Sequence, residues 1–423
     1  MNRRGLVVVE THPVQYHAPV YRELGRLGVA VTAIYGSDFS VAGYTDPEFQ
    51  THVAWDTDLL SGYRSVFVSR VATGGATAPL AVTGGGLRAA LEEARPSAIM
   101  ILGYGLRYHR RAIWDATRSG HPLLFRGETT DHARARTRAE EGLRNQLLRA
   151  LYARCSRLLY IGTRSREHFL RLGCPTERLV FSPYCVDGTS FRSTEADRAA
   201  LRGRIRSEWG AGEDVAVVLF SGKLVERKGC RLALDAVREL VERSQRQVLL
   251  VYLGDGPLRD ELSKRAEAPL EAPDEPEAPD EEDGHPGVRV LFAGFQNQSA
   301  LSAYFHGADV LVLPSRHSET WGLVVNEALS HGLPCVVSDA VGCAPDLVEA
   351  GVTGEVAESG SVESLSHALR RGLVLARRLE IRRQCRAKVA TFSVGRAAAG
   401  IAEAFFEVAG SEGGARAAPG LGG

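Results

Sequence analysis

The chain has 423 residues, two to three times the length of an ordinary domain, so we expect two domains. Apolar residues make up 44% of it and charged residues 24%, which excludes a small disulfide scaffold and a mainly disordered or collagen-like chain. The 51 Lys and Arg residues balance the 51 Asp and Glu residues, so no excess of charge indicates nucleic acid or an acidic membrane as the main partner.

The amino-terminal end predicts no secretion signal. Only four consecutive apolar residues precede Glu10, too few for a signal sequence, and no apolar run approaches membrane-spanning length. The seven cysteines contain no CxxC pair, so neither a zinc knuckle nor a disulfide framework is indicated. We therefore expect a cytoplasmic protein.

The first 190 residues alternate between short apolar runs and segments of helical periodicity. This alternation predicts a parallel sheet covered by helices. The expected strands are 6–9, 29–35, 65–68, 98–102, 123–125, 158–161 and 179–181, and the expected helices are 19–27, 86–94, 112–118, 143–153 and 165–172.

A second α/β unit follows from residue 191 to 392. It begins with a polar helix at 197–209, and apolar runs follow at 215–220, 248–253, 288–292, 310–313 and 335–337. An acidic, proline-rich stretch at 267–287 is typical of a solvated loop. We expect the last helix, within 393–410, to return to the first domain. Residues 411–423 are expected to form a flexible tail. The fold class is thus α/β, with two doubly wound parallel sheets.

A candidate anion site follows the strand at 310–313. A helix opens near Gly322, where free backbone amides and the helix dipole favour a phosphate. Glu319 precedes these amides and Glu327 lies on the helix, so the two carboxylates could bind sugar hydroxyls. In the alternative interpretation, Glu319 caps the helix and Glu327 is an ordinary surface residue.

Only four of the 51 basic residues are lysines, and two of them, Lys223 and Lys228, follow the strand at 215–220. A compact ammonium group suits diphosphate oxygens, although lysine is also a common surface residue. Because ligands of open α/β sheets bind at the carboxyl ends of the strands, we expect these lysines to converge with the helix after Glu319.

The segments GKLVERKG, LGDGP, FAGF and ETWGLVVNEALSHGLPCVVSD, in this order and spacing, resemble the retaining glycosyltransferases of family 4, the glycosyl transferases group 1. The resemblance is strongest from about residue 215 to 375. It implies the GT-B fold, in which two Rossmann-like domains face a cleft, with the acceptor domain at 1–190 and the nucleotide-sugar donor domain at 191–392.

The resemblance also implies a role for individual residues. Lys223 and Lys228 would hold the donor diphosphate, and Lys223 stands where the family commonly has arginine. The backbone amides of Gly322, Leu323 and Val324 would bind the distal phosphate. Glu319 would bind the transferred sugar, Glu327 the ribose, and Gly294 with Phe295 would lie beside the base.

The amino-terminal domain departs from the family pattern in two places. The loop after the first strand, THPVQYHAP, is not glycine-rich; His12, Gln15, Tyr16 and His17 are candidates for the acceptor or for the edge of the donor site, or they only order a turn. Arg126 and Glu128 stand near where relatives place a histidine. Glu128 is a candidate catalytic group, or the two form a structural pair.

Three further patterns carry less weight. Asp56 and Asp58 form a DxD triplet, which we interpret as coincidence because it lies far in sequence from the phosphate motifs. The GYG at 103–105 and the GDG at 254–256 lack the continuation of a dinucleotide-binding motif. Eleven arginines oppose five acidic residues between 126 and 171. This segment is a membrane-facing surface, or it is a solvated face above a core-facing helix with Leu143, Leu147, Leu148 and Leu151.

The sequence therefore predicts a metal-independent, retaining hexosyltransferase-like enzyme with no cofactor besides its nucleotide diphosphate sugar, GDP- or UDP-linked. The acceptor, whether a glycan, a lipid-linked sugar or a small molecule, stays open. The alternatives are a nucleotide-sugar epimerase of the same fold and a noncatalytic nucleotide-sugar-binding scaffold. Peripheral membrane contact is an open question as well.

Overall fold

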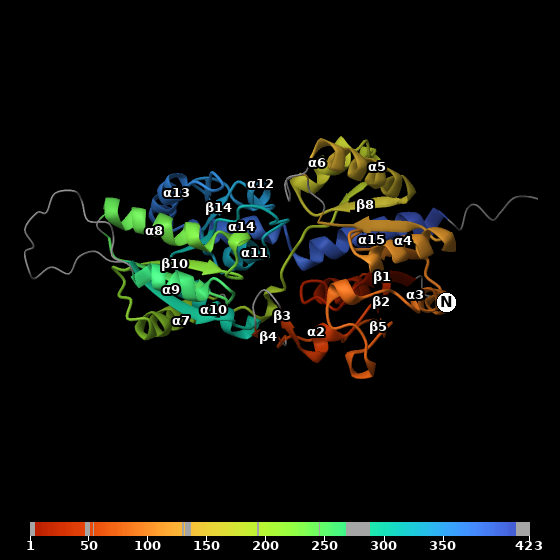
Figure 1. Ribbon diagram of the computed structural model, residues 1–423, viewed down its shortest axis with the longest axis horizontal. Helices are drawn as coiled ribbons and strands as arrows, with labels where there is room; N and C mark the ends of the chain where they lie inside the picture. Colours follow the sequence, from red (N-terminus) through yellow and green to blue (C-terminus); the bar gives the residue numbers. More distant parts are fainter. Residues whose placement is uncertain are drawn as a thin grey trace, which may run out of the picture.

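The computed structural model describes residues 5–46, 51–53, 55–128, 131, 137–192, 194–244, 246–267 and 288–411. Nearly all of the predicted acidic loop at 267–287 and of the tail at 411–423 lies outside these residues. Two lobes, each built around a parallel sheet, lie side by side along the long axis of the molecule (Figure 1).

The first lobe contains a seven-stranded sheet in the order β5-β2-β1-β6-β7-β8-β9, and the paired strands of this sheet run parallel. Its strands are β1 (Gly5–Glu10), β2 (Ala30–Tyr35), β5 (Arg64–Phe67), β6 (Ala98–Ile101), β7 (Leu123–Arg126), β8 (Arg157–Tyr160) and β9 (Leu179–Phe181). A separate hairpin pairs β3 (Tyr44–Asp46) with β4 (Thr51–Val53). The aliphatic strands are buried on both faces, as parallel sheets require.

Helices cover both faces of this sheet. They are α1 (Ala18–Arg26), α2 (Phe39–Ala42), α3 (Leu87–Ala94), α4 (Arg107–Ser119), α5 (Arg138–Arg154) and α6 (Thr163–Arg171), with short 3₁₀ turns at Val71–Thr73, Pro79–Ala81, Thr176–Arg178 and Gly188–Ser190. α4 and α5 begin five residues earlier than predicted, because their first turns are polar and carry no apolar period. A capping box of Thr137 and Glu140 fixes the start of α5.

The second lobe contains a six-stranded parallel sheet in the order β12-β11-β10-β13-β14-β15. Its strands are β10 (Ala216–Ser221), β11 (Val248–Leu253), β12 (Val288–Gly294), β13 (Val310–Leu313), β14 (Cys335–Ser338) and β15 (Gly354–Ala357). Its helices are α7 (Glu195–Glu208), η5 (Glu226–Lys228), α8 (Cys230–Ser244), α9 (Arg259–Glu267), α10 (Gln298–Gly307), α11 (Leu323–Ser330), α12 (Ala344–Leu347), α13 (Val362–Leu375) and α14 (Ile381–Ala390). Both lobes therefore have the predicted α/β class.

The last helix, α15 (Val394–Ser411), leaves the second lobe and packs on the first, against α1 and β9 (Figure 1). Ile401 and Phe405 belong to the apolar cluster of the first sheet. Gly400 permits this approach, because a Cβ there would lie 2.0 Å from the carbonyl oxygen of Phe181. The chain thus crosses between the lobes twice, once after β9 and once before α15.

The stretch from Ile381 to Gly410 is long and apolar enough to cross a membrane by length and composition, which the sequence reading did not expect. Half of its most apolar window is buried inside the molecule. Core helices pass the same test, and α15 is packed as one.

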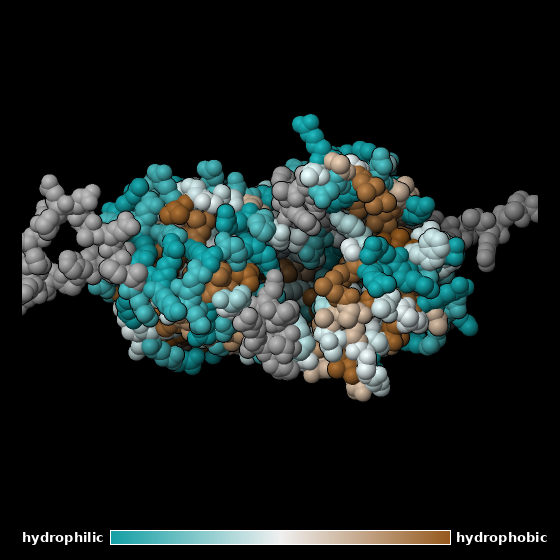
Figure 2. All heavy atoms as spheres, in the orientation of Figure 1, coloured by the Kyte–Doolittle hydropathy of each residue, from teal (hydrophilic) through white to brown (hydrophobic). Residues whose placement is uncertain are grey.

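The prediction for α5 is wrong in part. Leu148 and Leu151 are buried, but Leu143 and Leu147 are 62% and 64% exposed, so this helix carries apolar side chains on its outer face as well. Apolar surface is visible over α5 in Figure 2. The physical reason is that the buried stripe of α5 is narrow, and four leucines at this spacing span more than one face.

Candidate active site

The segments that follow the carboxyl ends of the central strands of the second sheet face the first lobe, which they contact through Glu327 and Thr320. Lys228 lies at the end of η5, after β10, and makes an ion pair with Glu319, which follows the adjacent strand β13. The hydroxyl of Ser315 donates a 3.0 Å hydrogen bond to the same Glu319 Oε2. A Cβ at Gly229 would lie 2.2 Å from the carbonyl oxygen of Pro314, so glycine lets the two loops meet there.

The helix α11 begins beside this ion pair. Its N-cap, Gly322, has a φ of 99°, in the left-handed region that favours glycine, and contributes no side chain to the cap. The first backbone amides of an α-helix have no partner within the helix, so the amides of Leu323 and Val324 are suited to bind an anion. Lys228, Glu319 and the α11 amino terminus therefore occupy one edge.

The GDG sequence is structural. A Cβ at Gly254 would lie 2.1 Å from the carbonyl oxygen of Gly222, and the amide of Leu224 donates to the Asp255 carbonyl at 2.9 Å. The loop after β11 is thus packed on the loop that carries Lys223, a half-buried residue. Gly294, at the end of β12 with a φ of 68°, accepts a 2.9 Å hydrogen bond from the Gly254 amide.

The two carboxylates of the DxD triplet accept hydrogen bonds from different parts of the chain. Asp56 crosses to the second lobe, where its Oδ2 accepts a 3.2 Å hydrogen bond from the Ser299 amide in the first turn of α10. Asp58 stays in its own loop and accepts from the amides of Leu60 and Ser61 at 3.0 and 3.1 Å. Trp55 lies edge-on to Phe295, with 6.2 Å between ring centroids. This loop therefore contacts the second lobe where the nucleotide base is expected.

Glu327 is buried, with 5% of its surface exposed, which excludes the ordinary surface residue considered above. The Tyr16 hydroxyl, from the loop after β1, donates a 3.3 Å hydrogen bond to Glu327 Oε1. Burial raises the pKa of the Glu327 carboxyl to about 7, and the hydrogen bond from Tyr16 opposes part of that rise. Tyr16 thus bridges the lobes at a carboxylate that the resemblance assigns to ribose.

Arg126 and Glu128 bond to different groups. The buried Arg126 guanidinium donates to the backbone carbonyls of Ser182 and Pro183, and it lies 4.9 Å from the centre of the Tyr184 ring. Glu128 accepts from the Tyr184 hydroxyl and, across the cleft, from the Thr320 hydroxyl at 2.6 Å. Arg126 therefore holds the crossover segment, and Glu128 reaches the neighbour of Glu319.

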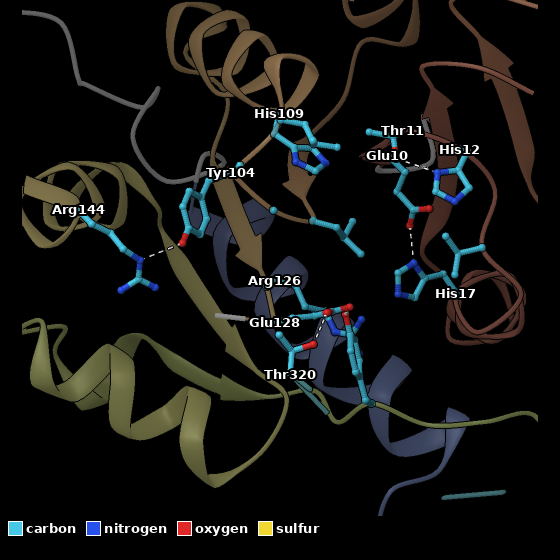
Figure 3. A pocket seen from close by; sticks show the side chains of 17 residues that line it. Glu10, Thr11, His12, His17, Tyr104, His109, Arg126, Glu128, Arg144 and Thr320 are labelled. Carbon is cyan, nitrogen blue, oxygen red and sulfur yellow. Dashed lines mark hydrogen bonds and ion pairs between the residues drawn. The ribbon is translucent and has the colours of Figure 1, made fainter. Parts of the chain in front are cut away.

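A cavity of about 440 Å³ opens beside Glu128 on the first lobe (Figure 3). Its lining includes four predicted candidates, His12, His17, Arg126 and Glu128. Among the lining residues that were not predicted are Glu10, Tyr104 and His109. The hollowed face between the lobes is visible in Figure 2. The other two candidates of that loop, Gln15 and Tyr16, do not line the cavity, and Gln15 is buried.

Glu10 could have been found from the sequence. It is the last residue of β1, and a charged side chain at the carboxyl end of a buried strand in an α/β sheet points to a ligand edge. His109 had a weaker signal, since it lies in the polar first turn of α4, just after the GYG.

The lobes are also joined on a second side. The Asp346 carboxylate of α12 accepts from the Thr163 amide at 3.0 Å and from the Thr163 hydroxyl at 2.8 Å, at the amino terminus of α6. Arg164 donates to the Ala340 carbonyl at 3.2 Å. Burial raises the pKa of Asp346, while its bonds to Thr163 oppose the rise.

Comparison with known proteins finds a family match within the second lobe. The family described as Glycosyl transferases group 1 matches residues 215–373. The chain is 28% identical over 217 residues to alpha-D-kanosaminyltransferase of Streptomyces kanamyceticus, covering 51% of this chain and 50% of that protein. It is 34% identical over 197 residues to D-inositol 3-phosphate glycosyltransferase of Streptomyces griseus, covering 45% and 38% of the two chains. The chain thus spans about half or less of the length of these curated relatives.

Solved structures match nearly the whole chain and define the fold. Sucrose-phosphate synthase from Thermosynechococcus elongatus superposes with a TM-score of 0.67 at 18% identity, over 97% of this chain and all of that one. Anabaena HepE in complex with UDP and glucose gives 0.63 at 16% identity, over 96% and 100%. Both lobes therefore form a GT-B fold, and residues 215–373, which lie in the second lobe, resemble the glycosyl transferases group 1.

Proposed function

We propose that the protein is a retaining glycosyltransferase that moves a sugar from a GDP- or UDP-linked donor to an acceptor hydroxyl. The observation that carries this proposal is the meeting of Lys228, Glu319 and the amino terminus of α11 at one edge of the second sheet. A cation and free amides suit a pyrophosphate, and a neighbouring carboxylate suits sugar hydroxyls. A fold match to HepE in complex with UDP and glucose supports the same donor class.

The chemistry follows from where charge develops. As the bond between the anomeric carbon and the donor phosphate breaks, the leaving nucleoside diphosphate gains negative charge. Two lysines and three backbone amides would stabilise that charge: Lys223, Lys228 and the amides of Gly322, Leu323 and Val324. Because these groups are already in place, they would do so without the free-energy cost of reorganising solvent. We propose that this stabilisation needs no metal and no further cofactor.

The remaining donor contacts are assigned by position. Glu319 would bind hydroxyls of the transferred sugar, and the buried Glu327 would accept hydrogen bonds from the ribose. Phe295 and Gly294, at the end of β12, would lie beside the base, where Trp55 of the first lobe already contacts Phe295.

The acceptor would approach from the first lobe, on the side of Glu128. In front-side attack, the acceptor oxygen bonds to the anomeric carbon on the face that the phosphate leaves, and the proton of that hydroxyl passes to the departing phosphate oxygen. Glu128, bonded to Thr320 beside Glu319, would orient the acceptor there. No described contact favours the epimerase or the scaffold, and the named relatives cited above are transferases.

The test has two stages. A thermal-shift screen with UDP, GDP, ADP and TDP first identifies the nucleotide that raises the unfolding temperature of the protein. The matching nucleotide sugar is then incubated with an acceptor panel, with and without EDTA, and the product's anomeric configuration is read by proton NMR. Retained configuration with undiminished turnover in EDTA supports the proposal; an isomerised donor formed without acceptor, or binding without any turnover, contradicts it.

A further inference from the structure

The cavity in Figure 3 contains a carboxylate oxygen with unusual surroundings. Glu10 is 4% exposed, and its Oε1 accepts from His17 Nδ1 at 2.9 Å and from the Tyr21 hydroxyl. Its Oε2 is buried and has no hydrogen-bond partner among the described residues. A buried carboxylate oxygen left without a partner is costly, so a group that donates to it would be bound favourably.

A second orphaned atom lines the same cavity. His109 Nδ1 is buried and has no partner within the described part of the chain. The first glycine of the GYG sequence makes room for this ring, because a Cβ at Gly103 would lie 2.9 Å from His109 Cε1. The GYG motif, which follows β6, thus makes room for a cavity side chain of α4. β6 is the neighbour of β1, whose end carries Glu10, and the two side chains lie near each other in Figure 3.

The charges that line the cavity disfavour an anionic ligand. Burial lowers the pKa of His12 to about 4 and also lowers that of His109, with Glu10 opposing both shifts, so these rings are neutral near pH 7. Of the described lining cations, Arg144 pairs with Asp131 at 3.5 Å and donates to the Tyr104 hydroxyl at 3.2 Å, and Arg126 is held by backbone carbonyls. No described lining cation is thus left to bind a phosphate.

Neutral imidazoles and a carboxylate match hydroxyl groups, which both donate and accept hydrogen bonds. The volume of about 440 Å³ lies within the usual range of small-molecule sites. The other end of the cavity is formed by Glu128 and by Thr320, which follows Glu319 in sequence. A ligand in this cavity would therefore sit next to the sugar that the proposed function places at Glu319.

We propose that this cavity binds the acceptor as a neutral polyhydroxylated ring, a sugar or cyclitol, with hydroxyls bonded to Glu10 Oε2 and His109 Nδ1. That the bound ring is an acceptor rests on the glycosyl transfer proposed above. Binding of the ring in the cavity can be measured without turnover. Glu10 is an acceptor-binding residue in this account, whereas the donor contacts all lie on the second lobe.

The experiment measures binding by saturation-transfer NMR and calorimetry with glucose, mannose, N-acetylglucosamine and myo-inositol, and with glucose 6-phosphate and inositol 1-phosphate as charged counterparts. We expect the full-length wild type to bind at least one neutral ring and to bind its phosphate less tightly. Glu10→Gln keeps the side-chain shape and should weaken that binding by about tenfold or more, the usual loss when a charged hydrogen-bonding partner is removed.

His109→Ala provides an independent variant if Glu10→Gln fails to fold, and it should weaken the same ligand. Glu23→Gln, on the adjacent helix α1 and outside the cavity, is the matched control. In a turnover assay, Glu10→Gln should raise KM for the acceptor more than KM for the donor, whereas Glu23→Gln should change neither.

The two proposals fail in different ways. If no nucleotide sugar is bound or used but a neutral ring binds in a manner sensitive to Glu10→Gln, the glycosyltransferase proposal fails and the cavity assignment stands. The cavity assignment is overturned if the donor is hydrolysed but neutral rings do not bind. It is also overturned if they bind to wild type and to both cavity variants with equal affinity, or if they bind less tightly than their phosphates.

Discussion

Lys228 and Glu319 form an ion pair although 91 residues separate them in the sequence. Each lies at the carboxyl end of a strand, and β10 and β13 are neighbours in the sheet. The pair is only slightly exposed, so removal of either side chain leaves a largely buried charge with fewer partners. The donor site of our proposal is built on this relationship.

Glu319→Ala should strongly reduce transfer while the fold is kept. The carboxylate would hold the sugar hydroxyls, and loss of such a charged hydrogen-bonding group is expected to lower kcat/KM by about a hundredfold. Initial rates at saturating and limiting donor provide the measurement. Glu358→Ala, an exposed residue of the same lobe, is the control and should retain full activity; full activity in Glu319→Ala would remove its assigned role.

Tyr16→Phe should tighten nucleotide binding. The Tyr16 hydroxyl bonds to the Glu327 oxygen that we assign to ribose, so its loss frees that oxygen for the ligand. One hydrogen bond of about 1 kcal/mol corresponds to roughly fivefold in affinity. Calorimetric titration with the preferred nucleotide measures this, with Tyr304→Phe on α10 as the control. Weaker binding by Tyr16→Phe would mean that Tyr16 itself holds the nucleotide.

The position of Glu327 predicts a pH dependence of stability. Burial raises the pKa of this carboxyl from its ordinary value of 4.5 to about 7, so between these pH values the folded protein holds a proton that the unfolded chain releases. The contribution of Glu327 to the free energy of unfolding should therefore be greatest below pH 4.5 and fall as the pH rises to 7. Denaturant unfolding of wild type and Glu327→Gln across this range checks the sign. The unfolding free energy of wild type minus that of Glu327→Gln should fall as the pH rises; a value that stays constant or increases would contradict the prediction.

Much of this site follows from the sequence, and the reason is local. Lys228, Glu319 and Gly322 each follow a recognisable buried strand, and parallel strands place their carboxyl ends at one edge whatever the loops do. The contact of Tyr16 with Glu327 could not be predicted in the same way, since it depends on how two lobes are oriented.

Other features depended on burial rather than pattern. Glu10 reads in the sequence as the polar end of an apolar run, and only the packing of His17 and Tyr21 on one carboxylate oxygen reveals the other as unpartnered. On α5, helical spacing alone could not tell the buried Leu148 from the exposed Leu147, one residue away.

Asp346→Ala should loosen the second contact between the lobes. Asp346 accepts three hydrogen bonds from Thr163 at the amino terminus of α6, which is how a helix-capping carboxylate acts. Loss of such a cap costs about 1 to 2 kcal/mol of unfolding free energy. Denaturant unfolding measures this, and Asp260→Ala, exposed on α9, is the control. Unfolding equal to wild type would show that the lobes are held without this contact.

The central claim is that the carboxyl edge of the second sheet binds a nucleoside diphosphate. Calorimetric titration of wild type and Lys228→Ala with UDP, GDP, ADP and TDP tests it most directly. We predict that wild type binds at least one of the four with a defined stoichiometry of one and that Lys228→Ala loses most of this affinity. Equal binding by both proteins, or no binding of any of the four by wild type, would contradict the account.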